Sequence, residues 1–522
     1  MLLSKLLANS RIEYTVVDAG GRNFACPYAN IEIEEIFCDS RQVVRNGLYI
    51  AIDGLHTDSH QYVSDAVSHG ARAAVVSRKA WIDGKVKLSK EQGVLICVED
   101  CREAIARIYA AWYSNPQDSM SFIGVTGTNG KTTVTRMIFE ILSRSGYPCG
   151  LIGTAGNLIS SPNKNGTGVT YEELGIKPIS SLANMTTPDP PELYKILERM
   201  RCDGVRYVVM EVTSHALALK KVAPISFEVG VFTNLSEDHL DFHSSMEEYY
   251  NCKKSLFKTC KTCVVNIDCK YGRRLSEELE VQRHTCSAEG RVADYAACDI
   301  RSRGEMGIEY RLASGRMRLR LQTGIPGVIT VMNTMQAAAA CNLLGISARD
   351  IKDSIASLEG IKGRLEKLKL PIKVGFSVYL DYAHTPDALE NLLRTAKMFS
   401  KRGQRIVLLF GCGGDRERQK RAMMGKIAAS MADFFVITTD NPRFERPSDI
   451  IDDILSGIGD EGHYTVIEDR ESAIDYVIKN ARGGDIILLA GKGHEEHQIK
   501  GNERLGFSER EIVDKLVKRY YG

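Results

Sequence analysis

The sequence shows little charge imbalance and has no long hydrophobic run. Its 68 lysine and arginine residues are balanced by 66 aspartate and glutamate residues, so the formal net charge is +2 over 522 residues. Near-neutrality gives no electrostatic reason to expect binding to nucleic acid or to an anionic membrane surface. No apolar segment approaches the roughly 20 residues that a membrane-spanning helix needs. The N-terminus "MLLSKLLANSRIEY" lacks the basic segment and apolar core of a secretory signal. We therefore expect no nucleic-acid partner and no membrane association.

The sequence also lacks the cysteine spacing of a disulfide framework or a structural zinc site. Its 14 cysteines are scattered, which in a large chain indicates reduced thiols and a cytoplasmic protein. Cys260 and Cys263 form one C-x-x-C, but no second pair and no suitably spaced histidines accompany it. We interpret these two, and likewise Cys97 and Cys101, as incidental cysteines. A metal or redox pair at Cys260 and Cys263 is the alternative.

The stretch "IGVTGTNGKTTVTRMIFEIL", residues 123–142, predicts a phosphate-binding loop between a strand and a helix. Backbone N–H groups and the positive end of the helix would face an anion there, with Lys131 in reach of terminal phosphate oxygens. The glycine spacing departs by one residue from the usual G-x-x-x-x-G-K-[ST]. An ordinary strand–turn–helix connection is the alternative. The helix is expected to bury residues spaced i, i+3, i+4, i+7 and i+8, namely Val134, Met137, Ile138, Ile141 and Leu142.

The chain is too long for one hydrophobic core. From about residue 118 onward, apolar strand-like runs alternate with helical segments, which favours mostly parallel sheets with helices on both faces. Residues 285–330 alternate in shorter segments and predict an antiparallel excursion, followed by a helix in "NTMQAAAACNLLG". We predict an α/β protein of three domains: a smaller N-terminal αβ domain at 1–117, a central doubly wound P-loop-type domain at 118–360 and a Rossmann-like αβ domain at 361–522.

Polar side chains follow several of these strands, where an open αβ sheet binds its ligands. Glu211 ends "VRYVVMEV" and is a candidate Mg²⁺ anchor near the phosphate loop; a helix cap or a solvated carboxylate is the alternative. "TNLSEDHLDFHSSMEEYYNCKKSLF", residues 233–257, is dense in ionisable groups, among them Asp238, His239, Asp241 and His243. A helix N-terminus capped by Ser236 is the structural alternative there. Lys253 and Lys254 alone are typical of a solvated helix face.

Seven motifs occur in one order: "GVTGTNGKTT", "EVTSHAL", "TNLSEDHLDFH", "DYAHTPDAL", "GCGGDRERQKR", "DNPR" and "GKGHE". Together they resemble the Mur ligase family, whose own loop, T-G-T-N-G-K-T, has the same glycine spacing. The resemblance extends from "CDSRQV" at residue 38 to "GKGHEEHQ" at residue 498. It implies a cytoplasmic, monomeric ligase in which ATP activates a carboxylate as an acyl phosphate and an amino acid's amine displaces the phosphate.

The resemblance also implies roles for individual residues. Lys131, Glu211, His239 and Lys253 would be catalytic. ATP would be bound by Gly127, Thr128, Asn129, Gly130, Lys131, Thr132, Thr133, Asn333, Arg364 and Asp381. Mg²⁺ would be held by Thr132, Glu211, His239 and Lys253, the lysine as a carbamate formed with CO₂. The UDP-linked substrate would contact Ser40, Thr186, Thr187, Thr213 and Lys221. The incoming amino acid would contact Arg416, Asp440, Asn441, Pro442, Arg443, Gly491 and Glu495.

The D-N-P-R form of this family is associated with meso-2,6-diaminopimelate, added to UDP-N-acetylmuramoyl-L-alanyl-D-glutamate. Diaminopimelate has a second carboxylate with which Arg443 can pair bidentately, whereas lysine has none. A proline turn with solvated charges is the alternative for this segment. Three residues depart from the family pattern: Lys221 replaces an arginine, Thr213 a serine and Thr330 an asparagine. These departures bear most on how the uridine nucleotide is bound. There are three competing functions: a ligase that adds lysine, a related ligase that acts on another carboxylate acceptor, and a nucleotide-dependent switch without catalytic activity.

Overall fold

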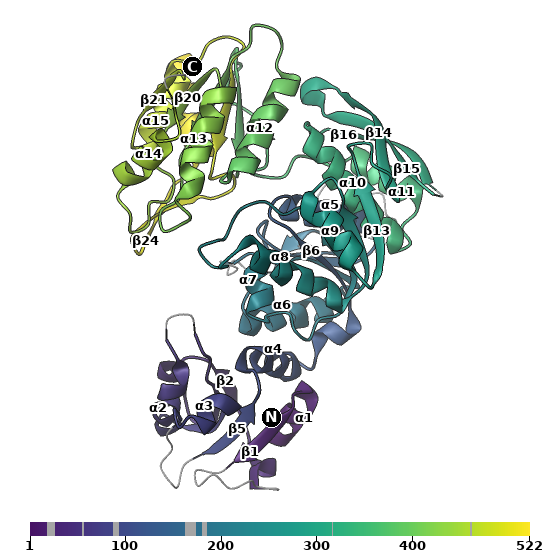
Figure 1. The fold of residues 1–522 in the computed structure, drawn as a ribbon, viewed down its shortest axis with the longest axis vertical. Coiled ribbons are helices and arrows are strands. Elements are labelled where there is room, and N and C mark those ends of the chain that lie inside the picture. Colours follow the sequence, from purple (N-terminus) through teal and green to yellow (C-terminus); the bar gives the residue numbers. More distant parts are fainter. Residues whose placement is uncertain are drawn as a thin grey trace.

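The computed structural model describes residues 1–17, 27–54, 57–86, 93–161, 174–179, 185–315, 317–459 and 462–522. Three main sheets follow one another along the long axis of the molecule, the N-terminal one at one end and the C-terminal one at the other (Figure 1). The α/β architecture is as predicted, whereas the boundaries at 117/118 and 360/361 stay predictions. Within the described part, no helix is long and apolar enough to span a membrane.

The N-terminal sheet has the order β1-β5-β4-β3-β2. Its strands are parallel except for β1, which runs antiparallel to β5 at one edge. The strands are β1 Tyr14–Val17, β2 Glu35–Phe37, β3 Gly47–Ile50, β4 Ala71–Ser77 and β5 Val94–Val98, and the helices are α1 Leu3–Ser10, α2 Val63–Ser68, α3 Arg78–Ile82 and α4 Cys101–Trp112. Helix α4 begins at the cap Asp100 and packs between α1 and the central part of the chain.

The central sheet places the strand that leads to the phosphate loop, β6, between β10 and β11, with the order β16-β15-β14-β13-β12-β11-β6-β10-β7-β8-β9. In this order, the neighbouring strands from β14 to β7 pair in parallel. The strands β8 and β9 continue the sheet in antiparallel pairing. The strands are β6 Ser121–Thr126, β7 Cys149–Ile152, β8 Leu158–Ser160, β9 Lys177–Pro178, β10 Tyr207–Glu211, β11 Phe227–Phe232, β12 Cys260–Asn266, β13 Gln282–Ser287, β14 Tyr295–Ser302, β15 Ile308–Ser314 and β16 Met317–Thr323.

Helices cover both faces of this sheet. The helix α5, Lys131–Arg144, buries the five predicted residues Val134, Met137, Ile138, Ile141 and Leu142 in one core together with α10 Val328–Leu343 and α11 Ala348–Ala356. The opposite face is covered by α6 Pro190–Cys202, α8 Met246–Lys254 and α9 Lys270–Glu278, with the short α7 Ser214–Ala218 nearby. The sheet is therefore doubly wound, as the alternation of strands and helices predicted.

The predicted antiparallel excursion is present, but its end was misplaced. Strands β14, β15 and β16 pair antiparallel. The last residues of the predicted excursion, 328–330, instead form the first turn of α10 together with Val331. Pro326 and Gly327, the latter with φ +102°, end the extended backbone there, and Val331 packs into the core against α5. Burial of the apolar face outweighs the strand preference of these β-branched residues.

The C-terminal sheet has the order β17-β18-β22-β19-β20-β21, and its strands are parallel except for β17. Apolar cores lie on both faces. The strands are β17 Glu366–Lys367, β18 Ser377–Asp381, β19 Ile406–Phe410, β20 Phe434–Ile437, β21 Tyr464–Val466 and β22 Ile486–Ala490. After them, β23 His497–Lys500 and β24 Glu503–Gly506 form a separate two-stranded hairpin. The helices are α12 Pro386–Phe399, α13 Gln419–Met431, α14 Pro447–Leu455, α15 Arg470–Lys479 and α16 Glu509–Tyr521.

Candidate active site

The loop Gly127–Gly130 connects β6 to the N-terminus of α5, as predicted for a phosphate-binding loop. Gly130 precedes the helix with φ +85°, a left-handed conformation that suits glycine. The Lys131 ammonium folds back over the loop and donates to the carbonyl oxygens of Gly127 at 2.9 Å and Thr128 at 2.7 Å. Burial lowers the pKa of Lys131, while Glu211 opposes that shift. A lysine cation beside this loop, at the N-terminus of a helix, suits an anionic ligand.

Gly127 fixes how closely this loop approaches the neighbouring strand. Its φ is +145°, and a Cβ there would lie 1.9 Å from Thr233 Oγ1. We expect Gly127→Ala to lower the free energy of unfolding by about 1–3 kcal/mol, because strain and a clash combine, and to raise the KM for ATP. Gly146→Ala is the control, since Gly146 has φ +84° but open space around it. Urea unfolding of both variants checks this; equal losses would show that the clash at Gly127 is relieved.

Glu211, the last residue of β10, faces the first turn of α5. Because β10 pairs in parallel with β6, the carboxyl ends of both strands meet at one edge. Glu211 Oε2 accepts from Thr132 Oγ1 at 3.0 Å, and Oε1 accepts from the Thr154 amide at 2.7 Å. Burial raises the pKa of Glu211, against the charge of Lys131. The sequence pattern missed Thr154, which follows β7, the other neighbour of β10.

These oxygen donors fit Mg²⁺, which proteins bind through one or two carboxylates while phosphates and water complete the coordination. Thr132 and Glu211 supply a hydroxyl and a carboxylate at the mouth of the phosphate loop. Across the described residues, no group of three or more His, Cys, Asp and Glu side chains is arranged as a metal site. Mg²⁺ at this point would therefore depend on phosphate oxygens for part of its coordination.

Residues 236–245 form a loop, and the helix after them, α8, is capped by Ser245. The alternative in which Ser236 caps a helix is wrong. His239 adopts φ +57°, its amide donates to Asp238 Oδ1 at 3.0 Å, and its ring lies 6.1 Å from the Tyr249 ring, centroid to centroid. Burial lowers the pKa of His239, so the neutral ring offers a lone pair. The loop thus presents His239 on the side of α8 that carries Tyr249.

The structure separates the two neighbouring lysines of α8. Lys253 is buried, and its Nζ donates to the Gly127 carbonyl at 2.8 Å and lies 4.6 Å from the centroid of the Tyr249 ring. Burial, and after it the charge of Lys131, holds the pKa of Lys253 well below its usual value. Lys254 instead pairs with Glu278 at 2.7 Å on the outside of the domain. The Lys253 side chain therefore contacts the Gly127–Gly130 loop from α8, whereas the Lys254 side chain faces solvent.

A cleft between the central and C-terminal sheets brings the predicted nucleotide residues together. Arg364 Nη2 donates to Thr132 Oγ1 at 3.3 Å, and Asn129 Nδ2 donates to Asp387 Oδ2 at 2.7 Å. The cleft is lined in part by Asn129, Gly130, Thr133, Thr330, Asn333, Arg364, Asp381, Tyr382 and His384. Our sequence reasoning missed Tyr382, whose ring lies 4.7 Å from the Arg364 guanidinium carbon.

Three of the five residues predicted for the UDP-linked substrate, Thr186, Thr187 and Thr213, lie near Glu211, and Lys221 reaches the Thr187 carbonyl at 3.4 Å. Thr187 Oγ1 donates to the Glu211 carbonyl at 2.8 Å, and the Thr186 hydroxyl lies 2.9 Å from that of Thr154. Thr213 caps α7, with its hydroxyl 3.3 Å from that of Thr187. Lys221 pairs with Asp189 at 2.7 Å. The fifth residue, Ser40, begins a 3₁₀ turn after β2 in the N-terminal sheet.

The residues predicted for the incoming amino acid follow β19, β20 and β22 at one edge of the C-terminal sheet. Asn441 Nδ2 donates to Glu495 Oε2 at 3.0 Å, and Arg443 Nη1 donates to the Gly414 carbonyl at 2.6 Å. Asp440 Oδ2 is buried and accepts no hydrogen bond from a described residue. Arg416 reaches across to Asp241 of the central part, at 3.3 Å. Burial, followed by the charge of Arg416, lowers the pKa of Arg443.

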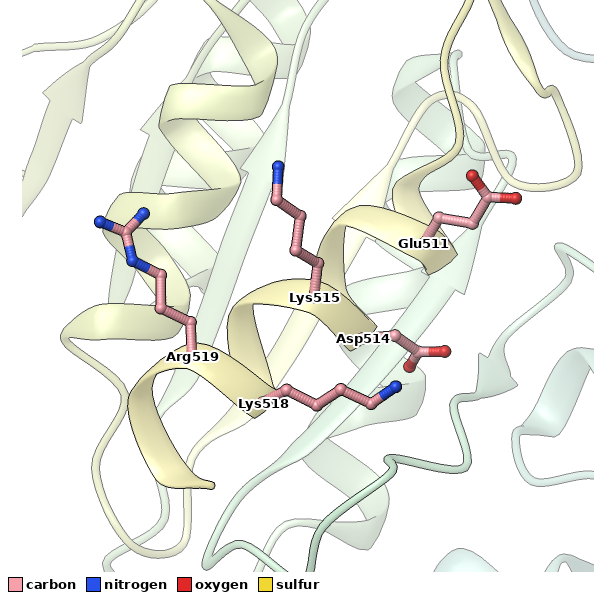
Figure 2. Close-up of a pocket in the computed structure, with 5 residues that line it drawn as sticks. All are labelled: Glu511, Asp514, Lys515, Lys518 and Arg519. Carbon is pink, nitrogen blue, oxygen red and sulfur yellow. The ribbon is translucent and has the colours of Figure 1, made fainter.

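Two other features stand apart from this site. A hollow on the outer helix α16 is lined by Glu511, Asp514, Lys515, Lys518 and Arg519 (Figure 2). None of these residues belongs to the predicted site. Cys260 and Cys263 are buried free thiols of β12, and the hydrogen bond from Cys263 raises the pKa of Cys260.

Comparison with known proteins agrees with this geometry. Residues 125–341 match the Mur ligase middle domain, and residues 363–493 match the Mur ligase, glutamate ligase domain. The chain is 40% identical to UDP-N-acetylmuramoyl-L-alanyl-D-glutamate--2,6-diaminopimelate ligase 1 of Clostridium acetobutylicum, over 95% of this chain and 97% of that protein. It is 37% identical to the same ligase of Clostridium tetani, over 98% of each.

Among solved structures, one of a UDP-N-acetylmuramoyl-L-alanyl-D-glutamate--2,6-diaminopimelate ligase superposes with a TM-score of 0.64 at 27% identity. It covers 97% of this chain and 98% of that one. The chain is thus similar to these ligases in sequence over nearly its full length and shares their fold. This agrees with the seven motifs, which occur in the order typical of the family. The chain belongs to the Mur ligase family.

Proposed function

We propose that this protein is the ATP-dependent ligase that joins meso-2,6-diaminopimelate to UDP-N-acetylmuramoyl-L-alanyl-D-glutamate in peptidoglycan precursor synthesis. The observation that carries the proposal is the convergence of Lys131 and Lys253 on the Gly127–Gly130 loop and of Glu211 on Thr132 in the helix turn that follows it. The relatives that share nearly the full length bear the name of this ligase.

In this reaction the terminal carboxylate of the UDP-linked substrate takes the γ-phosphoryl group of ATP, and ADP leaves. The amine of diaminopimelate then attacks the acyl carbon, phosphate leaves, and the amine loses a proton to give the amide. Phosphoryl transfer of this kind depends on positioning and charge neutralisation. Lys131 would neutralise the transferred phosphoryl group, and Arg364, Asn333 and Asp381 would hold the rest of the nucleotide in the cleft.

The remaining roles concern charge at the phosphates. Bound Mg²⁺ would neutralise phosphate charge and align the reacting oxygens. Thr132 and Glu211 would hold one ion, and His239 would help to hold a second. The neutral amine of Lys253 would add CO₂ and release a proton, giving a carbamate whose oxygens are anionic donors, which an ammonium cannot be. Burial of Lys253 against the Gly127 carbonyl supports its choice over Lys254.

Arg416 and Arg443 would recognise the carboxylate that distinguishes diaminopimelate from lysine. The two guanidinium groups lie close enough for the charge of Arg416 to lower the pKa of Arg443. A carboxylate bound beside them would relieve that repulsion and accept charge-assisted hydrogen bonds. Other residues line the same edge of the sheet and would hold the remaining groups of the amino acid, namely Asp440, Asn441, Pro442, Gly491 and Glu495.

The deciding experiment measures phosphate release by the purified protein with ATP, Mg²⁺ and UDP-N-acetylmuramoyl-L-alanyl-D-glutamate. We expect release with meso-diaminopimelate and none with L-lysine or without an amino acid. Release with lysine alone would overturn the role of Arg443 while keeping the ligase, and no release with either would contradict the ligase itself.

Arg443→Ala is expected to raise the KM for diaminopimelate about 10- to 100-fold, the worth of hydrogen bonds to a charged group. The KM for ATP should not move, because Arg443 does not line the cleft proposed to hold the nucleotide. Arg446→Ala is the matched control, since Arg446 lies on the same loop, is 82% exposed and pairs only locally with Asp449. An unchanged KM in the Arg443 variant would contradict its role in recognition.

A further inference from the structure

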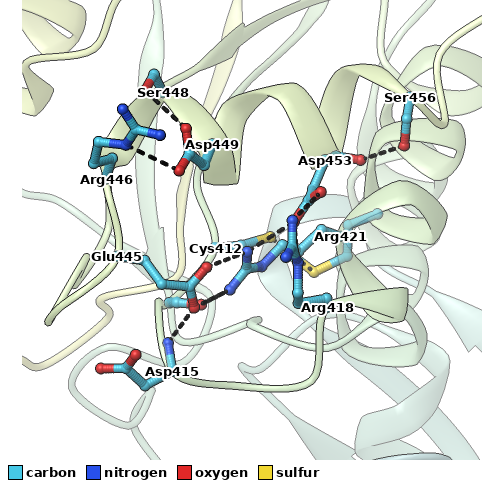
Figure 3. Close-up of polar contacts among 12 residues, drawn as sticks. Cys412, Asp415, Arg418, Arg421, Glu445, Arg446, Ser448, Asp449, Asp453 and Ser456 are labelled. Carbon is cyan, nitrogen blue, oxygen red and sulfur yellow. Dashed lines mark hydrogen bonds and ion pairs between the residues drawn. The ribbon is translucent and has the colours of Figure 1, made fainter.

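The two loops that carry Arg416 and Arg443 are joined by an ion-pair network that lies behind them, with a buried arginine at its centre and partly exposed carboxylates around it. Its centre is Arg421 on α13, whose side chain is fully buried. Figure 3 shows its guanidinium between Glu445, on the loop after β20, and Asp453, on α14. The hydrogen-bond partners of the Arg421 guanidinium among the described residues are Glu445, Asp453 and Gly413, none of which is assigned to a substrate.

Arg421 contacts both substrate loops directly. Its Nη1 and Nη2 donate to the two carboxylate oxygens of Glu445, each at 2.8 Å, and Nη2 also donates to the Gly413 carbonyl at 3.1 Å. Gly413 lies three residues before Arg416, and Glu445 two residues after Arg443. One buried guanidinium therefore holds the backbone of the first loop and the side chain of the second.

The contacts around this centre lock the two loops to one another. Glu445 Oε1 accepts from the Asp415 amide, and the Phe444 amide donates to Asp415 Oδ2 at 3.2 Å. The Gly414 amide donates to the Asn441 carbonyl at 2.9 Å. A Cβ on Gly414 would lie 1.9 Å from the Pro442 carbonyl, so the two backbones are in close contact.

This arrangement matters because Arg443 has a strained backbone. Its φ is +51°, a left-handed conformation that a residue with a side chain adopts at a cost. Its amide donates to the Ile499 carbonyl at 3.1 Å on one side, and Glu445 holds the loop on the other. A strained backbone conformation of this kind persists only where several surrounding contacts hold it in place.

We propose that Arg421 is a positioning residue for amino-acid recognition: through Glu445 and Gly413 it sets the spacing of Arg416 and Arg443 to fit the distal carboxylate of a diamino dicarboxylic acid. The inference rests on the proposed function. It deepens that function by assigning the fit of the carboxylate site to a buried ion pair behind the loops rather than to the two arginines alone. Rigid support of this kind fixes binding groups to within a fraction of an ångström.

Arg421→Lys and Glu445→Gln test the proposal, and both keep a hydrogen-bonding side chain. We expect each to raise the KM for diaminopimelate about tenfold while the KM for ATP and the kcat at saturating diaminopimelate stay within about twofold, because lysine cannot bridge Glu445 and Gly413 together. In an Arg443→Ala background the added factor should shrink, since the support acts through that side chain.

Arg418→Ala is the matched control. Arg418 lies one turn before Arg421 and binds the same Asp453 bidentately, but its side chain is 65% exposed. It should leave every KM unchanged. A variant that loses thermal stability but keeps its KM for diaminopimelate would overturn the proposal and leave Arg421 a structural residue. The wild-type protein is measured first: if it shows no diaminopimelate-dependent turnover, the proposed function and this inference both fail, whereas an active wild type with an unmoved Arg421→Lys KM contradicts the inference alone.

Discussion

Lys131→Met is expected to lower kcat about 1,000-fold or more while leaving the protein folded. Removing a single preorganised donor to a developing charge costs about 100- to 1,000-fold. Lys131 is in addition the cation at the centre of the phosphate loop. Its Nζ is 2.9 Å from the Gly127 carbonyl and 2.7 Å from that of Thr128, and we expect phosphate oxygens to replace these two carbonyls when ATP binds. Single-turnover phosphate release, compared with the wild type, measures the loss.

The same substitution should not destabilise the fold. The ammonium is desolvated against two carbonyl groups, and methionine fills a similar volume without a charge to bury. We expect the Tm of the Lys131→Met variant to equal or exceed that of the wild type, the pattern of a residue retained for activity at the expense of stability. A drop in Tm that accounts for the lost activity would contradict a catalytic role and make Lys131 a structural support of the loop.

The strand–loop–helix unit around Gly127–Gly130 could be predicted because its signals are local. The buried face of α5 repeats with the helical period, and all five residues predicted from it are 0–1% exposed. Glu211 could be placed beside the loop because parallel neighbouring strands end at the same edge of a sheet. Both inferences depend on residues within one strand–loop–helix unit or on a general property of αβ sheets.

The parts that escaped prediction depend on tertiary packing. The local pattern alone assigns Lys253 and Lys254 alike to a solvated face, and it was the family resemblance that singled out Lys253. The packing of α8 is what brings Lys253 to Gly127 and Lys254 to Glu278. Tyr382 and Arg421 belong to motifs visible in the sequence, yet their partners lie far along the chain. Arg421 and Glu445, for instance, are 24 residues apart. A buried charge of this kind has no periodicity that marks it.

The difference between the two lysines of α8 leads to the second large effect. Lys253→Met is expected to lower kcat about 100- to 1,000-fold, because the proposed carbamate supplies anionic oxygens beside the phosphates, and loss of such a group is comparable to loss of a preorganised donor. Lys254→Met is the matched control. Lys254 is the next residue of the same helix and forms an ion pair with Glu278 outside the site. A pair of this kind is worth about 0–1 kcal/mol, and the control variant should keep its kcat.

Removal of CO₂ distinguishes the carbamate from a role of the amine itself. In buffer freed of CO₂ the wild type should lose activity and regain it on addition of bicarbonate, and isotopically labelled bicarbonate should mark the wild type and the Lys254→Met variant but not Lys253→Met. Nζ lies 2.8 Å from the Gly127 carbonyl, and after carbamylation it keeps one N–H that can still donate to that carbonyl. The two anionic oxygens of the carbamate would then point away from the loop carbonyl and toward a cation. Activity that ignores CO₂ but still needs Lys253 would mean that the ammonium itself, as a second cation beside Lys131, serves the phosphates.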